Sequence, residues 1–174
     1  MKQIYLILLL VVIVSTNTLA QTQPSCSAAG YKQFDFWAGN WNVYGKDSLG
    51  NEKLIGTNLI EKKQDDCMLQ ENWTASQGNN TGTSINFYNA TDSTWNQVWV
   101  SNTGNILKLQ GKLEENSMVL YSQKMISRAG QPYVNRITWT PNEDGSVRQH
   151  WEVSGNKEKW QTVFDGLYRR QNTP

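Results

Sequence analysis

Hydrophobic and polar residues alternate along most of the chain after about residue 40, in short segments separated by Gly, Asn, Asp and Pro. A period of two is typical of β-strands with one buried face, and these separating residues form tight turns. No segment shows a sustained helical period. The pattern predicts strands over Asn40 to Lys46, Lys53 to Lys63, Cys67 to Ser76, Thr81 to Asn89, Thr94 to Ser101, Asn105 to Leu113, Ser117 to Met125, Tyr133 to Thr140, Ser146 to Ser154 and Lys157 to Arg169.

Consecutive hairpins of this number predict a sheet that closes on itself, because closure removes both exposed edges. We therefore expect an all-β fold, an antiparallel up-and-down β-barrel of about ten strands. A two-sheet sandwich is the alternative. The pattern breaks at Tyr31 to Trp41, YKQFDFWAGNW, where the aromatic residues do not alternate. Here we expect a short N-terminal helical plug under one end of the barrel, with Gly39 allowing a sharp turn into the first strand.

The period of two also assigns an inward face to each strand, and these faces mix aromatic rings with amides and one carboxyl. Buried polar groups cost a few kcal/mol each unless they are hydrogen-bonded, so a chain that only had to fold would place aliphatic residues there. Mostly apolar walls with a few placed polar groups are typical of small-molecule pockets. The predicted ligand-binding residues are Glu71, Trp73, Trp95, Gln97, Trp99, Asn135, Trp139, Gln149, Trp151 and Tyr168.

Two alternatives to this pocket remain open. Gln97, Gln149 and Glu71 can instead satisfy one another across neighbouring strands with no ligand. The register also matters, because a single bulge reverses every residue beyond it. Reversal would place Arg136 and Arg148 in the cavity and suit it to a carboxylate or phosphate. Without a bulge, the last strand turns Trp160, Thr162, Phe164 and Tyr168 inward.

The N-terminus has the pattern of a secretory signal peptide: Lys2, an apolar run from Ile4 to Val14, and small residues before Gln21. The run is about half of the roughly 20 residues that a spanning helix needs, so we expect cleavage after Ala20 and no membrane insertion afterwards. The expected organisation is a signal peptide over 1–20, an N-terminal segment over 21–33 and the β-barrel domain over 34–170. The location would be periplasmic or secreted, with a lipoprotein anchored through Cys26 as the alternative.

Charge and cysteine content narrow the possible partners. The formal net charge is +1 and falls to about zero without Lys2, and no run of like charge occurs, so nucleic acid and anionic membranes are not expected partners. The two cysteines, Cys26 and Cys67, most simply form one disulfide in an oxidising compartment, and two free thiols are the alternative. A structural zinc site would need four Cys or His ligands, and the chain has two cysteines and one histidine.

The opening FDFWAGNW resembles the FDFWxGxW opening of a family of uncharacterised, often exported bacterial proteins with lipocalin-like, calycin-type barrels. The similarity continues through Asp66-Cys67, Glu71 and Trp73, WNQVWV, Arg136 to Trp139, VRQHWEVS, and the strand with Trp160, Phe164 and Tyr168. The resemblance implies a barrel with a cavity and carries no settled activity. A more distant resemblance to haem-binding and fatty-acid-binding barrels makes haem a possible ligand, and His150 would have to be its axial ligand. The alternation turns His150 outward, so no cofactor is expected.

The sequence therefore predicts a secreted barrel that binds a small amphipathic molecule. A barrel enzyme of isomerase or cyclase type, with Glu71 as general acid or base, is a second hypothesis. An interaction module that binds protein or glycan through its outer surface is a third. No nucleophile elbow, phosphate loop or Cys/His pair occurs in the sequence, which favours binding over catalysis.

Overall fold

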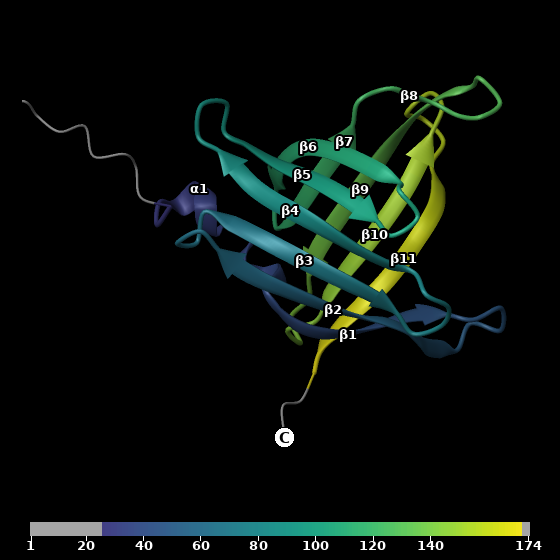
Figure 1. Ribbon diagram of the computed structural model, residues 1–174, viewed down its shortest axis with the longest axis horizontal. Helices are drawn as coiled ribbons and strands as arrows, with labels where there is room; N and C mark the ends of the chain where they lie inside the picture. Colours follow the sequence, from purple (N-terminus) through teal and green to yellow (C-terminus); the bar gives the residue numbers. More distant parts are fainter. Residues whose placement is uncertain (1–25, 172–174) are drawn as a thin grey trace, which may run out of the picture.

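The computed structural model describes residues 26–171 and shows a closed antiparallel β-barrel (Figure 1). Ten strands close the ring: each pairs with the next ring strand along the chain, and the last pairs with the first. The all-β barrel prediction is confirmed. The strands are β1 (Gly39–Lys46), β2 (Glu52–Lys63), β3 (Met68–Ala75), β4 (Thr81–Asn89), β5 (Thr94–Ser101), β6 (Ile106–Glu114), β7 (Ser117–Ser122), β9 (Pro132–Pro141), β10 (Val147–Ser154) and β11 (Gln161–Arg170), with the two-residue β8 (Met125–Ile126) paired to β9 outside the ring.

Two strands differ from their predicted ranges by more than one residue at an end. The predicted strand ending at Met125 is divided, because β7 stops at Ser122 and the chain resumes pairing only in β8. The predicted start of the last strand at Lys157 was wrong by four residues, since β11 begins at Gln161. Lys157 has a positive φ of 65°, so the chain is still turning at this point.

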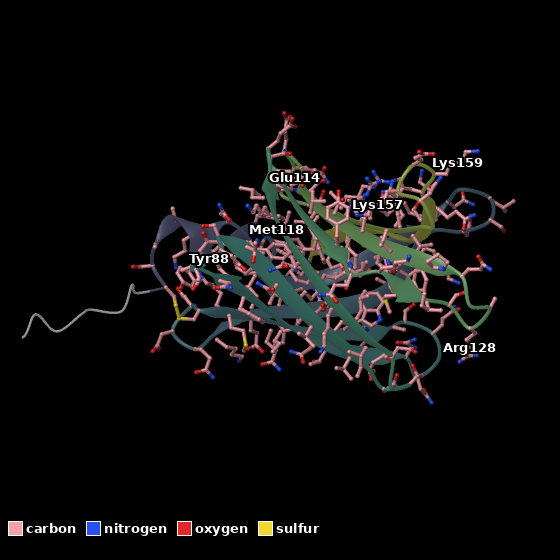
Figure 2. All side chains as sticks on the ribbon, turned by 90° about the horizontal axis from the view of Figure 1, so that it is seen from above. Tyr88, Glu114, Met118, Arg128, Lys157 and Lys159 are labelled. Carbon is pink, nitrogen blue, oxygen red and sulfur yellow. A yellow bond between two sulfur atoms is a disulfide. The ribbon has the colours of Figure 1, made fainter. Side chains whose placement is uncertain are left out.

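A plug of aromatic residues fills one end of the barrel, as the break in the alternation predicts. It consists of the helix α1 (Ala29–Lys32) and the 3₁₀ turn η1 (Asp35–Trp37). Phe34, Trp37 and Trp41 are fully buried, and the Trp41 indole donates to the Trp37 carbonyl at 2.9 Å. The other end, between the turns that carry Arg128, Lys157 and Lys159, lies on the far side of the molecule from Tyr88 (Figure 2). Tyr88 packs against Tyr31 of α1, with ring centroids 5.1 Å apart.

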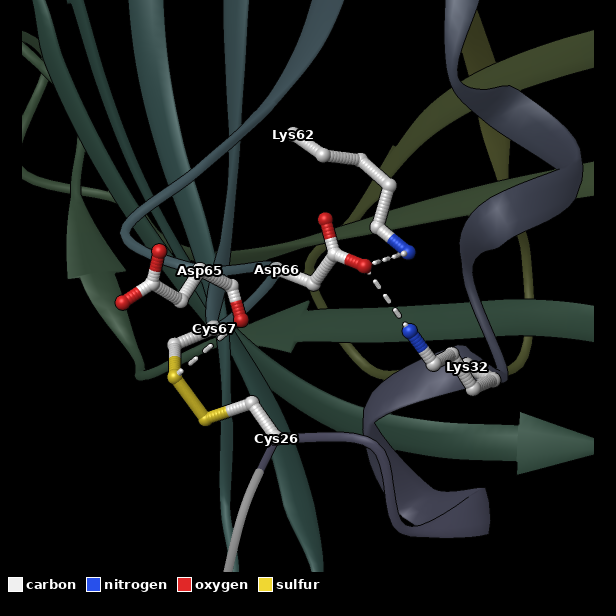
Figure 3. Close-up of a disulfide and its surroundings, with 6 residues drawn as sticks. All are labelled: Cys26, Lys32, Lys62, Asp65, Asp66 and Cys67. Carbon is white, nitrogen blue, oxygen red and sulfur yellow. Dashed lines mark hydrogen bonds and ion pairs between the residues drawn. A yellow bond between two sulfur atoms is a disulfide. The ribbon is translucent and has the colours of Figure 1, made fainter.

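The predicted disulfide between Cys26 and Cys67 is present (Figure 3). It joins the start of the plug segment to the turn between β2 and β3, with the two Cα atoms 5.0 Å apart. A disulfide is consistent with an extracellular or periplasmic location. The sulfur of Cys26 is used in this bond and is therefore not available for a lipid anchor.

The β2–β3 turn beside the disulfide has an unusual backbone. Gln64, Asp65 and Asp66 have φ values of 54°, 52° and 67°, the left-handed region that residues other than glycine seldom adopt. The Asp66 carboxylate holds the turn to the plug, because it accepts from Lys32 Nζ at 3.0 Å and lies 3.2 Å from Lys62 Nζ (Figure 3). These ion pairs and the disulfide together fix the plug under the barrel.

The predicted signal peptide, residues 1–20, lies outside the described residues. Within residues 26–171, no helix has the length and apolar character needed to cross a membrane.

Candidate functional site

A cavity of about 660 Å³ opens at the end of the barrel opposite the plug. Its wall combines aromatic rings with amides and a single carboxyl. The lining residues are Glu71, Trp73, Ala75, Gln77, Asn80, Gln97, Trp99, Ser101, Asn105, Ile106, Leu107, Met125, Tyr133, Asn135, Ile137, Gln149, Trp151, Phe164 and Tyr168. A second hollow, of about 770 Å³, lies on the outer surface over Asn42, Tyr44 and Arg169 and contains none of the predicted site residues.

Eight of the ten predicted site residues line the cavity. They are Glu71, Trp73, Gln97, Trp99, Asn135, Gln149, Trp151 and Tyr168. Trp95 and Trp139 also point inward, but they lie deeper and contact the plug. The Phe34 ring is 5.4 Å from Trp95 and 5.2 Å from Trp139, and the Trp95 indole donates to Gln33 at 3.2 Å. Their predicted placement in the pocket was therefore wrong, because alternation assigns a face of the sheet and not a depth along the barrel axis.

Glu71 lies at the inner end of the cavity and is 4% exposed. Its Oε1 accepts from Asn58 Nδ2 at 2.7 Å, and its Oε2 accepts from Ser84 Oγ at 2.6 Å. Burial raises the pKa of Glu71 to about 7, against the opposing effect of these two hydrogen bonds. The carboxyl is therefore divided between its charged and neutral forms near neutral pH.

Gln97 is held by a second set of hydrogen bonds on the same side. Its Nε2 donates to Asn86 Oδ1 at 2.8 Å, and Asn86 Nδ2 donates to Ser84 Oγ at 2.9 Å and to the Leu69 carbonyl at 3.2 Å. Because Ser84 also donates to Glu71, the amide of Gln97 and the carboxyl of Glu71 are connected through two β4 side chains.

Tyr168 extends this network to Gln149. The Tyr168 hydroxyl donates to Gln149 Oε1 and accepts from Asn58 Nδ2 at 3.3 Å. Burial raises the pKa of Tyr168 well above its ordinary value, so the hydroxyl remains protonated and can donate. We call the connected set the polar belt; it comprises Gln149, Tyr168, Asn58, Glu71, Ser84, Asn86 and Gln97.

A separate pair of polar contacts lies on the opposite wall. The Trp151 indole donates to Asn135 Oδ1 at 2.9 Å, and Asn135 Nδ2 donates to Ser122 Oγ at 3.2 Å. Asn135 on this wall and Gln97 in the polar belt therefore each make internal hydrogen bonds and also line the cavity, so the two sequence-based interpretations of Gln97 are compatible.

Two glycines make room for indole rings along the wall. A side chain at Gly56 would collide with the six-membered ring of Trp73, and one at Gly82 would collide with that of Trp99. Each indole therefore leans over the neighbouring strand. Phe164 packs perpendicular to Trp73 with ring centroids 6.0 Å apart, and both rings line the cavity.

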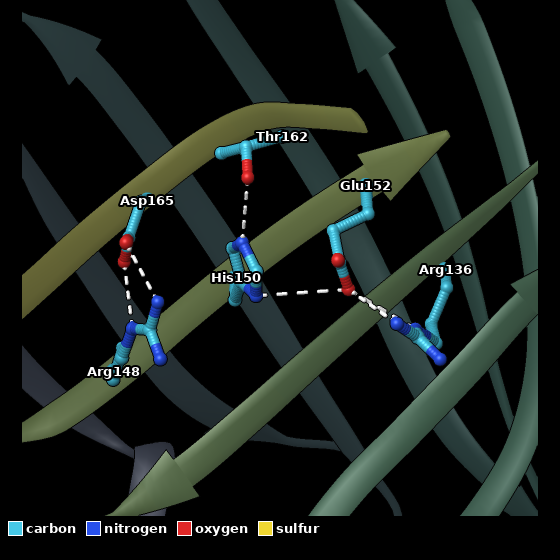
Figure 4. A network of polar contacts seen from close by, with 6 residues as sticks. All are labelled: Arg136, Arg148, His150, Glu152, Thr162 and Asp165. Carbon is cyan, nitrogen blue, oxygen red and sulfur yellow. Dashed lines mark hydrogen bonds and ion pairs between the residues drawn. The ribbon is translucent and has the colours of Figure 1, made fainter. Parts of the chain in front are cut away.

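The arginines of β9 and β10 lie on the outer face (Figure 4). Arg136 donates to Glu152 Oε2 at 2.7 Å, and Arg148 Nη2 donates to Asp165 Oδ2 at 2.7 Å. His150 is also on this face. The alternative of a cationic cavity lined by arginines is therefore wrong, and no haem ligand is presented to the lumen by His150.

Two inward assignments fail beyond a bulge. The β10–β11 register shifts between Trp151 and Glu152, which pair with Phe164 and Thr162. Beyond this shift Thr162 faces outward and contacts His150 Nε2 at 3.0 Å. Trp160, predicted inward, also lies outside, where the Arg136 guanidinium stacks 4.0 Å from its ring centroid.

Sequence reasoning missed three members of the polar belt: Asn58, Ser84 and Asn86. All three are fully buried. In β4 the usual alternation is inverted, since Ser84 and Asn86 face inward while Ile85 and Phe87 face solvent at 40% and 36% exposure. The sequence of β4 alone carries no signal for them; the register of β4 against its neighbours does, because it pairs Ser84 with Glu71 and Asn86 with Gln97.

The chain matches no protein-family model, and no curated protein is significantly similar to it. The resemblance to the exported bacterial family with the FDFWxGxW opening therefore stays a prediction.

Proposed function

We propose that this protein is a secreted barrel that binds one small amphipathic molecule in its open cavity. The observation that carries the proposal is the cavity itself, about 660 Å³, with aromatic residues near the mouth and the polar belt at its inner end. Small-molecule pockets are typically about 300–1,000 Å³ and have this mixture of apolar walls with few polar groups.

The packing of the lumen supports binding over a purely structural role. Protein interiors are normally close-packed, and a β-barrel of small diameter can be filled by its own side chains. Here the plug end is filled in that way, by residues such as Trp37 and Trp139. At the mouth end Gly56 and Gly82 let the indoles of Trp73 and Trp99 lie along the wall. The centre of the barrel there is left as a cavity instead of being filled by side chains.

Export is supported by two independent features. The disulfide between Cys26 and Cys67 suits an oxidising compartment, and the N-terminal sequence has the pattern of a cleaved signal peptide. The resemblance of FDFWAGNW to exported barrel proteins agrees with both.

Catalysis by Glu71 is the second candidate, because a carboxyl with a pKa of about 7 is suited to proton transfer at neutral pH. A catalytic Glu71 predicts that Glu71→Gln abolishes turnover of a bound substrate and leaves its binding largely intact. Retained turnover in that variant would exclude this role.

Native mass spectrometry of protein purified from its exported fraction tests the binding proposal. We expect a reproducible extra mass that is lost on denaturation, and its absence from an Ala75→Trp variant, in which an added indole enters the lumen near the mouth. The matched control is Gly155→Trp, at a turn outside the cavity. A clean apo mass for the wild type, together with failure of small aromatic and aliphatic probes to bind by calorimetry, would contradict the proposal.

A further inference from the structure

The cavity has no positive group to receive an anion. Among the described residues that line it, the ionisable side chains are Glu71 and two tyrosines, and none is Lys, Arg or His. Carboxylate and phosphate ligands are normally held by Arg or Lys. An anionic ligand would also approach the carboxyl of Glu71, so the cavity disfavours fatty acids and phosphates.

The arrangement suits a cation instead. Glu71 and Trp73 are two residues apart on the inward face of β3, and Gln97 and Trp99 stand in the same relation on β5. Two residues of a strand span roughly 7 Å, so an acceptor group is followed by an indole one step nearer the mouth on both strands. Aromatic rings attract cations, and a carboxylate beneath them provides the counter-ion.

The hydrogen bonds to Glu71 leave its acceptor capacity partly free. Each carboxylate oxygen accepts one hydrogen bond, Oε1 from Asn58 and Oε2 from Ser84, and each oxygen has a second lone-pair site. The Tyr168 hydroxyl donates to Gln149, so it does not compete as a donor to Glu71. The carboxyl is thus held in position and retains room for an incoming N–H.

We propose that the ligand is a protonated amine carried on an apolar body, with its ammonium group on Glu71 and its body between the indoles of Trp73 and Trp99. This inference rests on the proposed binding function and names its ligand class. The apolar body fills the mouth half of the cavity, and the amide of Gln97 provides a further polar contact at the inner end.

Charge at Glu71 makes this binding dependent on pH. The groups that face its carboxyl are the uncharged Asn58 on β2, Ser84 on β4 and Tyr168 on β11. An ammonium beside the carboxyl lowers its pKa, so binding displaces the proton that Glu71 partly retains at neutral pH. Lys157 and Lys159 at the open end are exposed. At physiological salt the electrostatic potential of their charges is screened within about 8 Å.

Isothermal titration calorimetry with three probes of similar shape tests the ligand class: 2-phenylethylamine, 2-phenylethanol and phenylacetate. At pH 7.5 we expect the amine to bind at least tenfold more tightly than the alcohol, and the carboxylate to bind weakest. In Glu71→Gln the amine should lose at least tenfold in affinity while the alcohol is unchanged. Glu114→Gln, on the exposed end of β6, is the matched control and should bind as the wild type does.

Proton release gives a readout that needs no variant. Titrating the wild type with the amine at pH 7 in two buffers of different ionisation enthalpy should show release of up to about half a proton per amine bound, and the alcohol should release none. Binding of the alcohol or the carboxylate as tightly as the amine would overturn the inference and leave the binding function standing. If the molecule released from the native protein is a carboxylic or phosphoric acid, the ligand class is likewise overturned and the binding function stands. Failure of all three probes with a clean apo mass would overturn both.

Discussion

At the scale of single residues, the amide of Gln97 shows why a polar side chain sits between two indoles. It faces the cavity and also supplies the donor for Asn86 Oδ1 at 2.8 Å. The alternation of Trp95, Gln97 and Trp99 was sufficient to predict that Gln97 points inward. Its partner Asn86 was not predictable from β4 alone, because Ile85 and Phe87 make the outward face of that strand the more apolar one.

Replacing Gln97 should therefore reduce stability. In Gln97→Leu the buried Asn86 Oδ1 loses its donor, and an unsatisfied buried acceptor costs about 1–3 kcal/mol. We expect a loss of that size in the free energy of unfolding, measured by urea denaturation. Gln110→Leu, at an exposed position on β6, is the control and should change stability by less than about 0.5 kcal/mol. Equal stability of the two variants would show that the Gln97 hydrogen bond is not needed.

Glu71 should make stability depend on pH in a direction opposite to that of an ion-paired acid. Its pKa is raised from 4.5 to about 7 in the folded protein, so the folded state binds the proton more tightly than the unfolded chain. Stability from this group is therefore full below about pH 4.5 and falls as pH rises to about 7, by roughly 3 kcal/mol.

The measurement is the difference in unfolding free energy between wild type and Glu71→Gln at pH 4 and at pH 8. The difference should shift by roughly 3 kcal/mol in favour of the variant at the higher pH. Glu114→Gln should show the wild-type dependence. A difference that is the same at both pH values would mean that Glu71 is not protonated more readily in the fold.

At the scale of elements, strand positions were predictable and strand faces were only partly so. The bounds of β4 and β5 follow directly from alternation between turn residues. The outward placement of Thr162 and Trp160 was not predictable, because the bulge opposite Trp151 and Glu152 depends on how β10 and β11 meet. Pairing between strands adds information that a single strand does not contain.

The contact between β4 and β5 at Gly82 gives a prediction at this scale. A methyl group in Gly82→Ala would collide with the Trp99 indole, so the ring must move toward the lumen. Overpacking of this kind costs about 1–3 kcal/mol. We expect that loss in the wild-type background and a smaller one in Trp99→Leu, compared by a double-mutant cycle of urea unfolding.

Gly155→Ala is the matched control for this cycle. A β-carbon at Gly155 would lie 3.5 Å from the Pro132 carbonyl, which is ordinary contact, and its effect should be the same in both backgrounds. If Gly82→Ala also costs the same in both backgrounds, Trp99 is not the side chain that requires the glycine.

At the scale of the whole molecule, the plug and the disulfide close one end of the barrel and leave the other open. The disulfide was predictable from an even pair of cysteines, and the plug from aromatic residues that fail to alternate. The depth of Trp95 and Trp139 was not, because it depends on where Phe34 enters the barrel. The plug thus sets which inward residues form core and which face the cavity.

Removing the disulfide should lower global stability without changing the cavity. The bridge spans 41 residues of sequence, and a loop of that size contributes up to roughly 4 kcal/mol in the chain-entropy model. We expect a Cys26→Ser/Cys67→Ser double variant to lose stability in that range by urea unfolding, and reductant to lower the wild type to the same level. Full reduction is verified by a gain of two hydrogens in mass. If the fully reduced wild type keeps the unfolding free energy of the oxidised form, the prediction is contradicted.

The division between plug and mouth also separates the tryptophans that point into the barrel into two optical classes. Trp37, Trp41 and Trp139 are fully buried, whereas Trp73, Trp99 and Trp151 line the cavity. Indole emission depends on the polarity around the ring, so entry of a ligand shifts the emission wavelength of the cavity tryptophans. The emission of the buried tryptophans stays constant. The protein thus carries its own fluorescent reporter of occupancy, and a compound collection can be screened on the unlabelled wild-type chain.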